Sequence, residues 1–130
     1  MAKICNIEKI MSCLNRWDPS DLSCIELLEI QYNSTTHQTD IKISSLFQER
    51  DLVQSWPNNM QSYDVVMLFF AICDLKIAPQ HKFPMQIMGF TIDDISERGL
   101  ENINFIVQDY EDNQLSFFCN QIEILSVTPR

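Results

Sequence analysis

Glycine is scarce in this chain of 130 residues, which contains only Gly89 and Gly99. Loops that cradle phosphate groups need several glycines, because the backbone must approach the phosphate oxygens closely. The HExxH pattern of zinc peptidases and the GxSxG pattern of serine hydrolases are absent as well. These absences argue against enzymes that use a phosphate loop, a helical zinc motif or a serine nucleophile of that type.

Long hydrophobic runs and paired cysteine motifs are also missing. The longest uncharged apolar run, 65–73, has nine residues, whereas a helix that spans a bilayer needs about 20. Glu8 interrupts the position where a secretory signal would build its apolar region. The five cysteines are an odd number and form no CxxC pair. We therefore expect reduced thiols, no metal site, no cofactor and a cytoplasmic location.

Positive charge is the third shortage. The chain has nine Lys and Arg against 18 Asp and Glu, a formal net charge of −9. This balance repels nucleic acids and anionic membranes, so we expect neither as a partner. The imbalance is greatest over 93–123, where Arg98 is the single cation among eight carboxylates: Asp93, Asp94, Glu97, Glu101, Asp109, Glu111, Asp112 and Glu123. We expect a local negative field at one end of the molecule.

Apolar side chains are plentiful enough for a folded core. Hydrophobic residues make up 45% of the chain and charged residues 21%, which separates it from disordered sequences. A length of 130 residues is close to the commonest domain size. We expect a single domain that spans residues 1–130.

The first part of the chain predicts a helix and then a β-hairpin. Apolar residues recur every three or four positions over 4–15, which predicts an amphipathic helix. Pro19 then stops the helix. Apolar residues alternate over 23–32 and again over 39–43, so these segments form the hairpin, with a bulge near residues 27–28.

The middle of the chain predicts a central strand. Residues 63–70 are apolar on both faces after Asp64, as in a strand covered on both sides. Segment 44–59 fits either a short helix or a packed loop, and 74–77 either extends the central strand or turns a corner. Residues 85–95 alternate, and Gly89 marks a bulge or a close crossing of two segments.

The last part of the chain predicts a second hairpin. After a helical turn at 96–100, two alternating runs, 103–107 and 115–119, flank an acidic turn. Residues 122–127 give a final strand. The fold class is therefore α+β: a predominantly antiparallel sheet, with a sandwich as one arrangement, and an N-terminal helix on one face or edge.

The residues that could perform catalysis are few. His37 lies in a polar turn and His81 in a loop bracketed by prolines, and both are expected to be solvated. Asp93 and Asp94 are adjacent on a strand, so they point to opposite faces and do not converge on a metal. A small enzyme that uses a carboxylate and a histidine as acid and base stays open as an alternative, and it needs a pocket that joins the two.

Several side chains are better suited to a protein interface. Glu97 and Glu101 would share a face if their turn is helical, where like charges repel unless a cation intervenes. Trp56, Tyr63 and Tyr110 are candidate aromatic anchors, Tyr110 above all because it lies between Asp109 and Glu111. An acidic mimic of nucleic acid is a further alternative, and it predicts regularly spaced carboxylates along an extended face.

The C-terminal half resembles a known family. The strings "YDVVMLFFAICDLKI" and "FPMQIMGFTIDDISERGLENINFIVQDYEDNQLSFFCNQIEIL" are similar to small bacterial immunity proteins encoded beside polymorphic or contact-dependent growth inhibition toxins. The similar features are Tyr63-x-Val65-x-Met67-x-Phe69, Gln86-Ile87-x-Gly89-Phe90-x-Ile92, and the run from Tyr110 to Cys119 before Ile122-Glu123-Ile124. The resemblance covers about 63–125.

This resemblance implies a binding protein and not an enzyme. It implies a cytoplasmic antitoxin that occludes the active site of a toxin domain, which is often a nuclease lined with Lys and Arg. An acidic surface would then mimic phosphates and steer association. From charge, and not from a family motif, we expect partner contacts from Asp93, Asp94, Glu97, Glu101, Asp109, Tyr110, Glu111 and Asp112.

Overall fold

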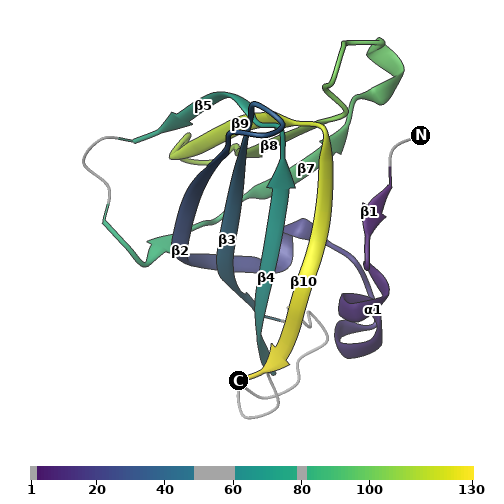
Figure 1. Cartoon of the computed structure of the whole chain (residues 1–130). Helices are drawn as coiled ribbons and strands as arrows, with labels where there is room; N and C mark the ends of the chain where they lie inside the picture. The colour runs from purple at the N-terminus through teal and green to yellow at the C-terminus, as the bar shows by residue number, and fades with distance from the viewer. Residues whose placement is uncertain (1–2, 49–60, 79–81) are drawn as a thin grey trace.

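The computed structural model describes residues 3–48, 61–78 and 82–130 (Figure 1). In these residues the strands form two sheets. Sheet A has the order β1-β10-β4-β3-β2-β6 and sheet B the order β5-β9-β8-β7. The elements are β1 (Ile4–Cys5), α1 (Glu8–Leu14), η1 (Pro19–Asp21), β2 (Leu22–Asn33), β3 (Gln38–Gln48), β4 (Ser62–Phe70), β5 (Cys73–Ile77), β6 (Met85–Gln86), β7 (Phe90–Asp94), η3 (Ser96–Arg98), β8 (Phe105–Asp109), β9 (Leu115–Cys119) and β10 (Gln121–Pro129).

The predicted α+β class is confirmed. All strand pairs are antiparallel except β1 with β10, and α1 is the one α-helix in the described part of the chain. The strands of sheet B run across those of sheet A (Figure 1). The inward side chains of both sheets share one core, in which Phe69 of sheet A meets Phe117 of sheet B edge to face at 5.1 Å.

Strand β4 is central, as its apolar pattern predicts. It pairs with β10 on one side and with β3 on the other. Its residues alternate between buried and half-buried, with Tyr63, Val65, Met67 and Phe69 on the buried face. The sequence predicted a strand buried on both faces, but only one face of β4 is fully buried and the other is half-buried.

The first hairpin is also confirmed, with its bulge close to the expected position. The pairing of β2 with β3 shifts register between Ile25 and Leu27, which leaves Glu26 as the extra residue. Strand β3 continues to Gln48, so the start of segment 44–59 is a strand and neither a helix nor a loop. Residues 49–60 of that segment lie outside the described residues.

The N-terminal helix is shorter than predicted. It spans only Glu8–Leu14, and residues 4–5 form β1, which pairs in parallel with β10. Asn6 adopts a left-handed backbone conformation (φ 63°), which a continuous helix excludes. Its side-chain amide donates to Glu123 Oε2 at 3.3 Å. The helix predicted over 4–15 is thus wrong in its first turn, because pairing with a distant strand overrides a local periodicity that fits both structures.

The chain turns a corner between the two sheets after β4. Ala71 has φ 53° and its N–H donates to Asp40 Oδ1 at 2.9 Å, and Asp74 has φ 53° as well. Of the two alternatives for 74–77, the corner is the correct one, because β5 pairs with β9 in sheet B. Strands β5 and β7 therefore form the opposite edges of sheet B.

Candidate functional site

The acidic residues of the C-terminal half lie at both ends of the β7–β8 pair. Phe90 pairs with Asp109 and Asp94 pairs with Phe105, so the segment after β7 and the turn after β8 point in opposite directions. The two ends are about 13 Å apart, because four residues of strand separate them. The acidity expected at one end of the molecule is therefore divided into two groups. The loop group is Asp93, Asp94, Glu97 and Glu101, and the turn group is Tyr110, Glu111 and Asp112.

All four carboxylates of the loop group are exposed. Asp94 Oδ1 accepts from the Ser96 N–H at 2.9 Å and from Ser96 Oγ at 2.6 Å, so the carboxylate is held in one orientation. The helical turn η3 ends at Gly99, which has φ 67°. Glu101 follows that end, so Glu97 and Glu101 do not share a helical face.

The turn group lies over Gly89, and Tyr110 is 54% exposed. A Cβ atom at Gly89 would lie 2.8 Å from the Tyr110 ring and 2.7 Å from Glu111 Cγ. These distances are too short for contact between carbon atoms. The close crossing predicted at Gly89 is confirmed, and the absence of a side chain there lets the turn pack against the start of β7.

Asp109 does not belong to the exposed surface. It is the last residue of β8 and is fully buried, with a relative exposure of 0%. Its Oδ2 accepts from Gln114 Nε2 at 3.1 Å, and its Oδ1 accepts from the Asp112 N–H at 3.4 Å. The surface contact expected of Asp109 is incorrect for this structure, because the carboxylate is enclosed by the turn that it stabilises.

One of the predicted aromatic anchors, Tyr63, is buried and does not lie on the surface. Tyr63 is only 6% exposed, and its hydroxyl lies 2.5 Å from Gln61 Oε1 and 3.2 Å from the Cys13 carbonyl oxygen, two acceptors that share its one proton. It therefore ties α1 to sheet A, and its interpretation as an interface residue is wrong. Trp56 lies outside the described residues.

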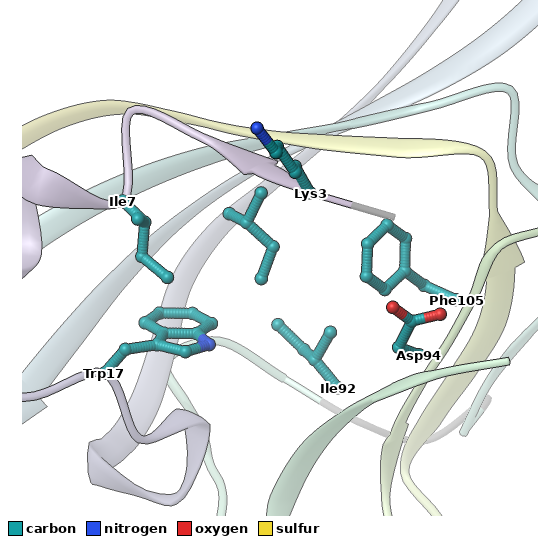
Figure 2. Close-up of a pocket in the computed structure, with 7 residues that line it drawn as sticks. Lys3, Ile7, Trp17, Ile92, Asp94 and Phe105 are labelled. Atoms are coloured by element: carbon teal, nitrogen blue, oxygen red, sulfur yellow. The ribbon is translucent and has the colours of Figure 1, made fainter. Parts of the chain in front are cut away.

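A pocket of about 340 Å³ lies on the core-facing side of β7 (Figure 2). We name it the β7 pocket; it is lined by Lys3, Ile4, Ile7, Trp17, Ile92, Asp94 and Phe105. The Trp17 ring stacks on the Phe47 ring, with ring centroids 6.2 Å apart. Sequence reasoning did not single out Trp17, because the segment around Pro19 gives only a helix-stop signal.

A smaller depression of about 170 Å³ also lies beside β7, and Ile92 lines both cavities. Asp93 of the loop group and Tyr110 of the turn group both line this depression. Asp18 lines it as well and had no functional signal in the sequence. Asp93 and Asp94, in contrast to Ile92, line different cavities.

Among the residues that the structure describes, no histidine lines either cavity. His37 is exposed in the turn after β2, where its Nδ1 lies 3.2 Å from the Tyr32 hydroxyl. His81 lies outside the described residues. In the described ranges no three His, Cys, Asp or Glu side chains converge to hold a metal ion. The acid–base enzyme therefore gains no support from these two cavities.

Residues 5–125 match a family model, and that model describes immunity proteins, the class of antitoxins that bind a cognate toxin protein. The chain belongs to the family Immunity protein PIM8. No curated protein and no solved structure matches it. The resemblance of 63–125 to immunity proteins is confirmed, and the family extends over most of the N-terminal half.

None of the helices within residues 3–48, 61–78 and 82–130 combines the length and the apolar character needed to cross a bilayer.

Proposed function

We propose that this antitoxin neutralises a cationic nuclease toxin by covering the toxin's active site with the surface on both sides of β7. The observation that carries the proposal is the match to an immunity protein family, together with the exposed carboxylates of the loop and turn groups. A nuclease binds phosphate through Lys and Arg, so carboxylates can occupy the same positions. The formal net charge of −9 supports a cationic partner in the same way.

Charged side chains and aromatic side chains would contribute at different stages of binding. Exposed charges act at long range, so they speed the encounter and favour the correct orientation. Apolar and aromatic side chains act after contact and slow dissociation. Tyr110 is the aromatic residue best placed for the second role, because it is exposed beside Glu111 and Asp112.

The cellular setting is part of the same proposal. An antitoxin of a contact-dependent growth inhibition system acts in the cytoplasm of the cell that makes the toxin or receives it from a neighbour. The toxin gene would then lie beside the gene for this chain. It would encode a large protein whose C-terminal domain is basic.

Co-expression tests the proposal. The C-terminal domain encoded by the neighbouring reading frame is produced with and without this chain, and nucleic acid cleavage is measured with the purified proteins. We expect growth arrest and cleavage by the toxin alone, and loss of both when the antitoxin is present. A toxin domain that does not cleave nucleic acid would refute the nuclease, and one that stays active in the presence of the antitoxin would refute neutralisation.

A pair of matched variants tests the role of the carboxylates. Glu111→Gln/Asp112→Asn removes two negative charges from the turn group. Glu29→Gln/Asp74→Asn removes the same charge from β2 and β5. We expect slower association only for the first variant, and equal slowing of both would show that net charge matters and position does not.

A further inference from the structure

We infer that residues 27–33 of β2 pair with the same residues of a second copy of this chain. The two strands run antiparallel across a two-fold axis, so that sheet A continues from one copy into the other. This inference goes beyond the proposed function, because it concerns the chain by itself and a different sheet from β7. Three features of 27–33 carry it: unpaired backbone groups, an exposed apolar row, and a sequence that is complementary to itself.

Most of β2 forms an edge of sheet A. Its start pairs with β6 at Cys24 and Ile25, and within the described residues no strand pairs with 27–33 on the side away from β3. In Figure 1, β3, β4 and β10 all follow β2 on the same side. The backbone groups of such an edge are available to another strand.

The hydrogen bonds of β3 show which residues of β2 point outward. The Thr39 carbonyl accepts from the Ile72 N–H at 2.8 Å, and Ile72 follows β4, so this carbonyl points away from β2. Tyr32 pairs with Thr39, so the Tyr32 backbone groups point to the free edge. The direction alternates along a strand, and the pairing is regular after the bulge, so Ile30 and Leu28 point outward as well. In the described part of the chain no hydrogen bond occupies the N–H or C=O of these three residues.

The side chains of the same three residues form an apolar row. They lie on the core-facing side of sheet A, because Ile30 pairs with Ile41, which is fully buried. Leu28 packs partly against the core, whereas Ile30 is 54% exposed and Tyr32 is 63% exposed. The row therefore begins in the core and continues onto the surface, where a second apolar row would cover it.

A second copy of β2 fits this edge because the strand is complementary to itself. With Ile30 of one copy opposite Ile30 of the other, Leu28 lies opposite Tyr32, and Glu29 lies opposite Gln31. The outward-pointing residues then face one another, so each N–H of the row meets a carbonyl of the other copy. Glu29 does not face another carboxylate, and it faces an amide that already approaches it within the strand, with Gln31 Nε2 3.5 Å from Glu29 Oε2.

The composition of this edge favours a second copy over a strand of a cationic toxin. Glu29 is the one charged residue in 27–33, so this edge offers little attraction to a cationic strand. Sheet edges that must stay unpaired are commonly protected by Lys, Pro or a bulge. Residues 27–33 contain neither Lys nor Pro, and the bulge of β2 comes before them.

Sedimentation equilibrium of the full chain tests the pairing. We expect the wild type to form a dimer as its concentration rises. Ile30→Lys places two like charges opposite each other at the axis and should raise the dissociation constant by about a hundredfold or more. The matched control Met11→Lys adds the same charge at a 42% exposed position of α1, and it should leave the dissociation constant unchanged. The melting temperature of each variant, measured at low concentration, verifies that the monomer stays folded.

Charge changes at Gln31 test the register. Gln31→Lys would lie opposite Glu29 of the second copy and should tighten the dimer about fivefold. Gln31→Glu would place two carboxylates opposite each other and should weaken the dimer by a similar factor. Because Gln31→Lys and Met11→Lys change the net charge equally, their comparison separates position from net charge.

Hydrogen exchange, measured by NMR, tests which backbone groups take part. The N–H groups of Leu28, Ile30 and Tyr32 should exchange more slowly as the protein concentration rises. The N–H groups of Glu29 and Gln31 point to β3, so they should be protected at every concentration.

Several results would overturn the inference. These are a wild type that stays monomeric at every concentration, a dimer that Ile30→Lys does not weaken, and equal dissociation constants for Gln31→Lys and Gln31→Glu. Protection of the edge N–H groups only after the toxin domain is added would assign the edge to the toxin and would refute the pairing of two copies. Neutralisation of the toxin is measured separately, so a failure of either proposal leaves the other standing.

Discussion

The buried contact between Asp109 and Gln114 leads to a quantitative prediction about stability. Asp109 Oδ2 accepts from Gln114 Nε2 at 3.1 Å, and the second contact, from the Asp112 N–H, is longer at 3.4 Å. A hydrogen bond to a charged group contributes about 1.5–3 kcal/mol, and a bond as long as the second one adds little. We expect Asp109→Ala to lower the free energy of unfolding by about 2 kcal/mol.

Urea denaturation, followed by circular dichroism, measures this free energy. The matched control is Asp112→Ala, which removes an exposed carboxylate of the same turn and should change stability by less than about 0.5 kcal/mol. A double-mutant cycle with Gln114→Ala isolates the contact itself. The double variant should cost about 1–2 kcal/mol less than the sum of the two single variants.

Two results would refute this reasoning. Strictly additive costs in the cycle would show that the two side chains do not stabilise each other. An Asp109→Ala variant as stable as the wild type would show that the carboxylate is solvated and not enclosed. In that case Asp109 would return to the set of exposed contact residues.

Three further predictions concern other parts of the fold. Tyr63→Phe removes the hydroxyl that contacts Gln61 Oε1 and the Cys13 carbonyl and should cost about 1 kcal/mol in the same assay; no cost would mean that neither contact stabilises the fold. Gly89→Ala should shift the NMR signals of the Tyr110 ring with a stability change below about 1 kcal/mol, because the atoms it meets belong to movable side chains; an unmoved ring would contradict the close crossing. Burial raises the pKa of the Cys119 thiol to about 12, so at pH 8 it should resist iodoacetamide until the protein unfolds, and rapid labelling of the folded protein would contradict its burial.

The strands were predictable from the sequence because their burial follows a period of two. Residues 63–70, 105–109 and 115–119 alternate between buried and half-buried positions in the structure. In such a strand every second side chain faces the core, so the alternation can be recognised from the residues of the strand alone. The bulge near Leu27 was visible for the same reason, since a bulge interrupts the alternation.

The first turn of the predicted helix was wrong because its structure depends on a remote segment. The spacing of Ile4, Ile7 and Ile10 fits a helix, but Ile4 pairs with Ile122 near the other end of the chain. No local pattern contains that information. The left-handed conformation of Asn6 is a consequence of the same long-range contact, since the Asn6 amide also reaches β10.

The candidate site could be predicted only in part. The exposed carboxylates and Tyr110 were found from charge and turn signals, because exposed turns are polar. The burial of Asp109 was not, since its environment is created when Gln114 folds back over it. The β7 pocket was not found either, because its walls come from segments that the sequence separates by about 75 residues or more.

The central claim is that carboxylates beside β7 meet a cationic toxin, and its most direct test is the association rate constant measured against ionic strength. The toxin domain from the neighbouring reading frame is the partner, and stopped-flow fluorescence gives the rate. The account predicts a rate that falls steeply as salt is added, with Glu111→Gln/Asp112→Asn slower than the wild type at low salt. A rate constant that does not change with salt, and is equal for the two proteins, would contradict it.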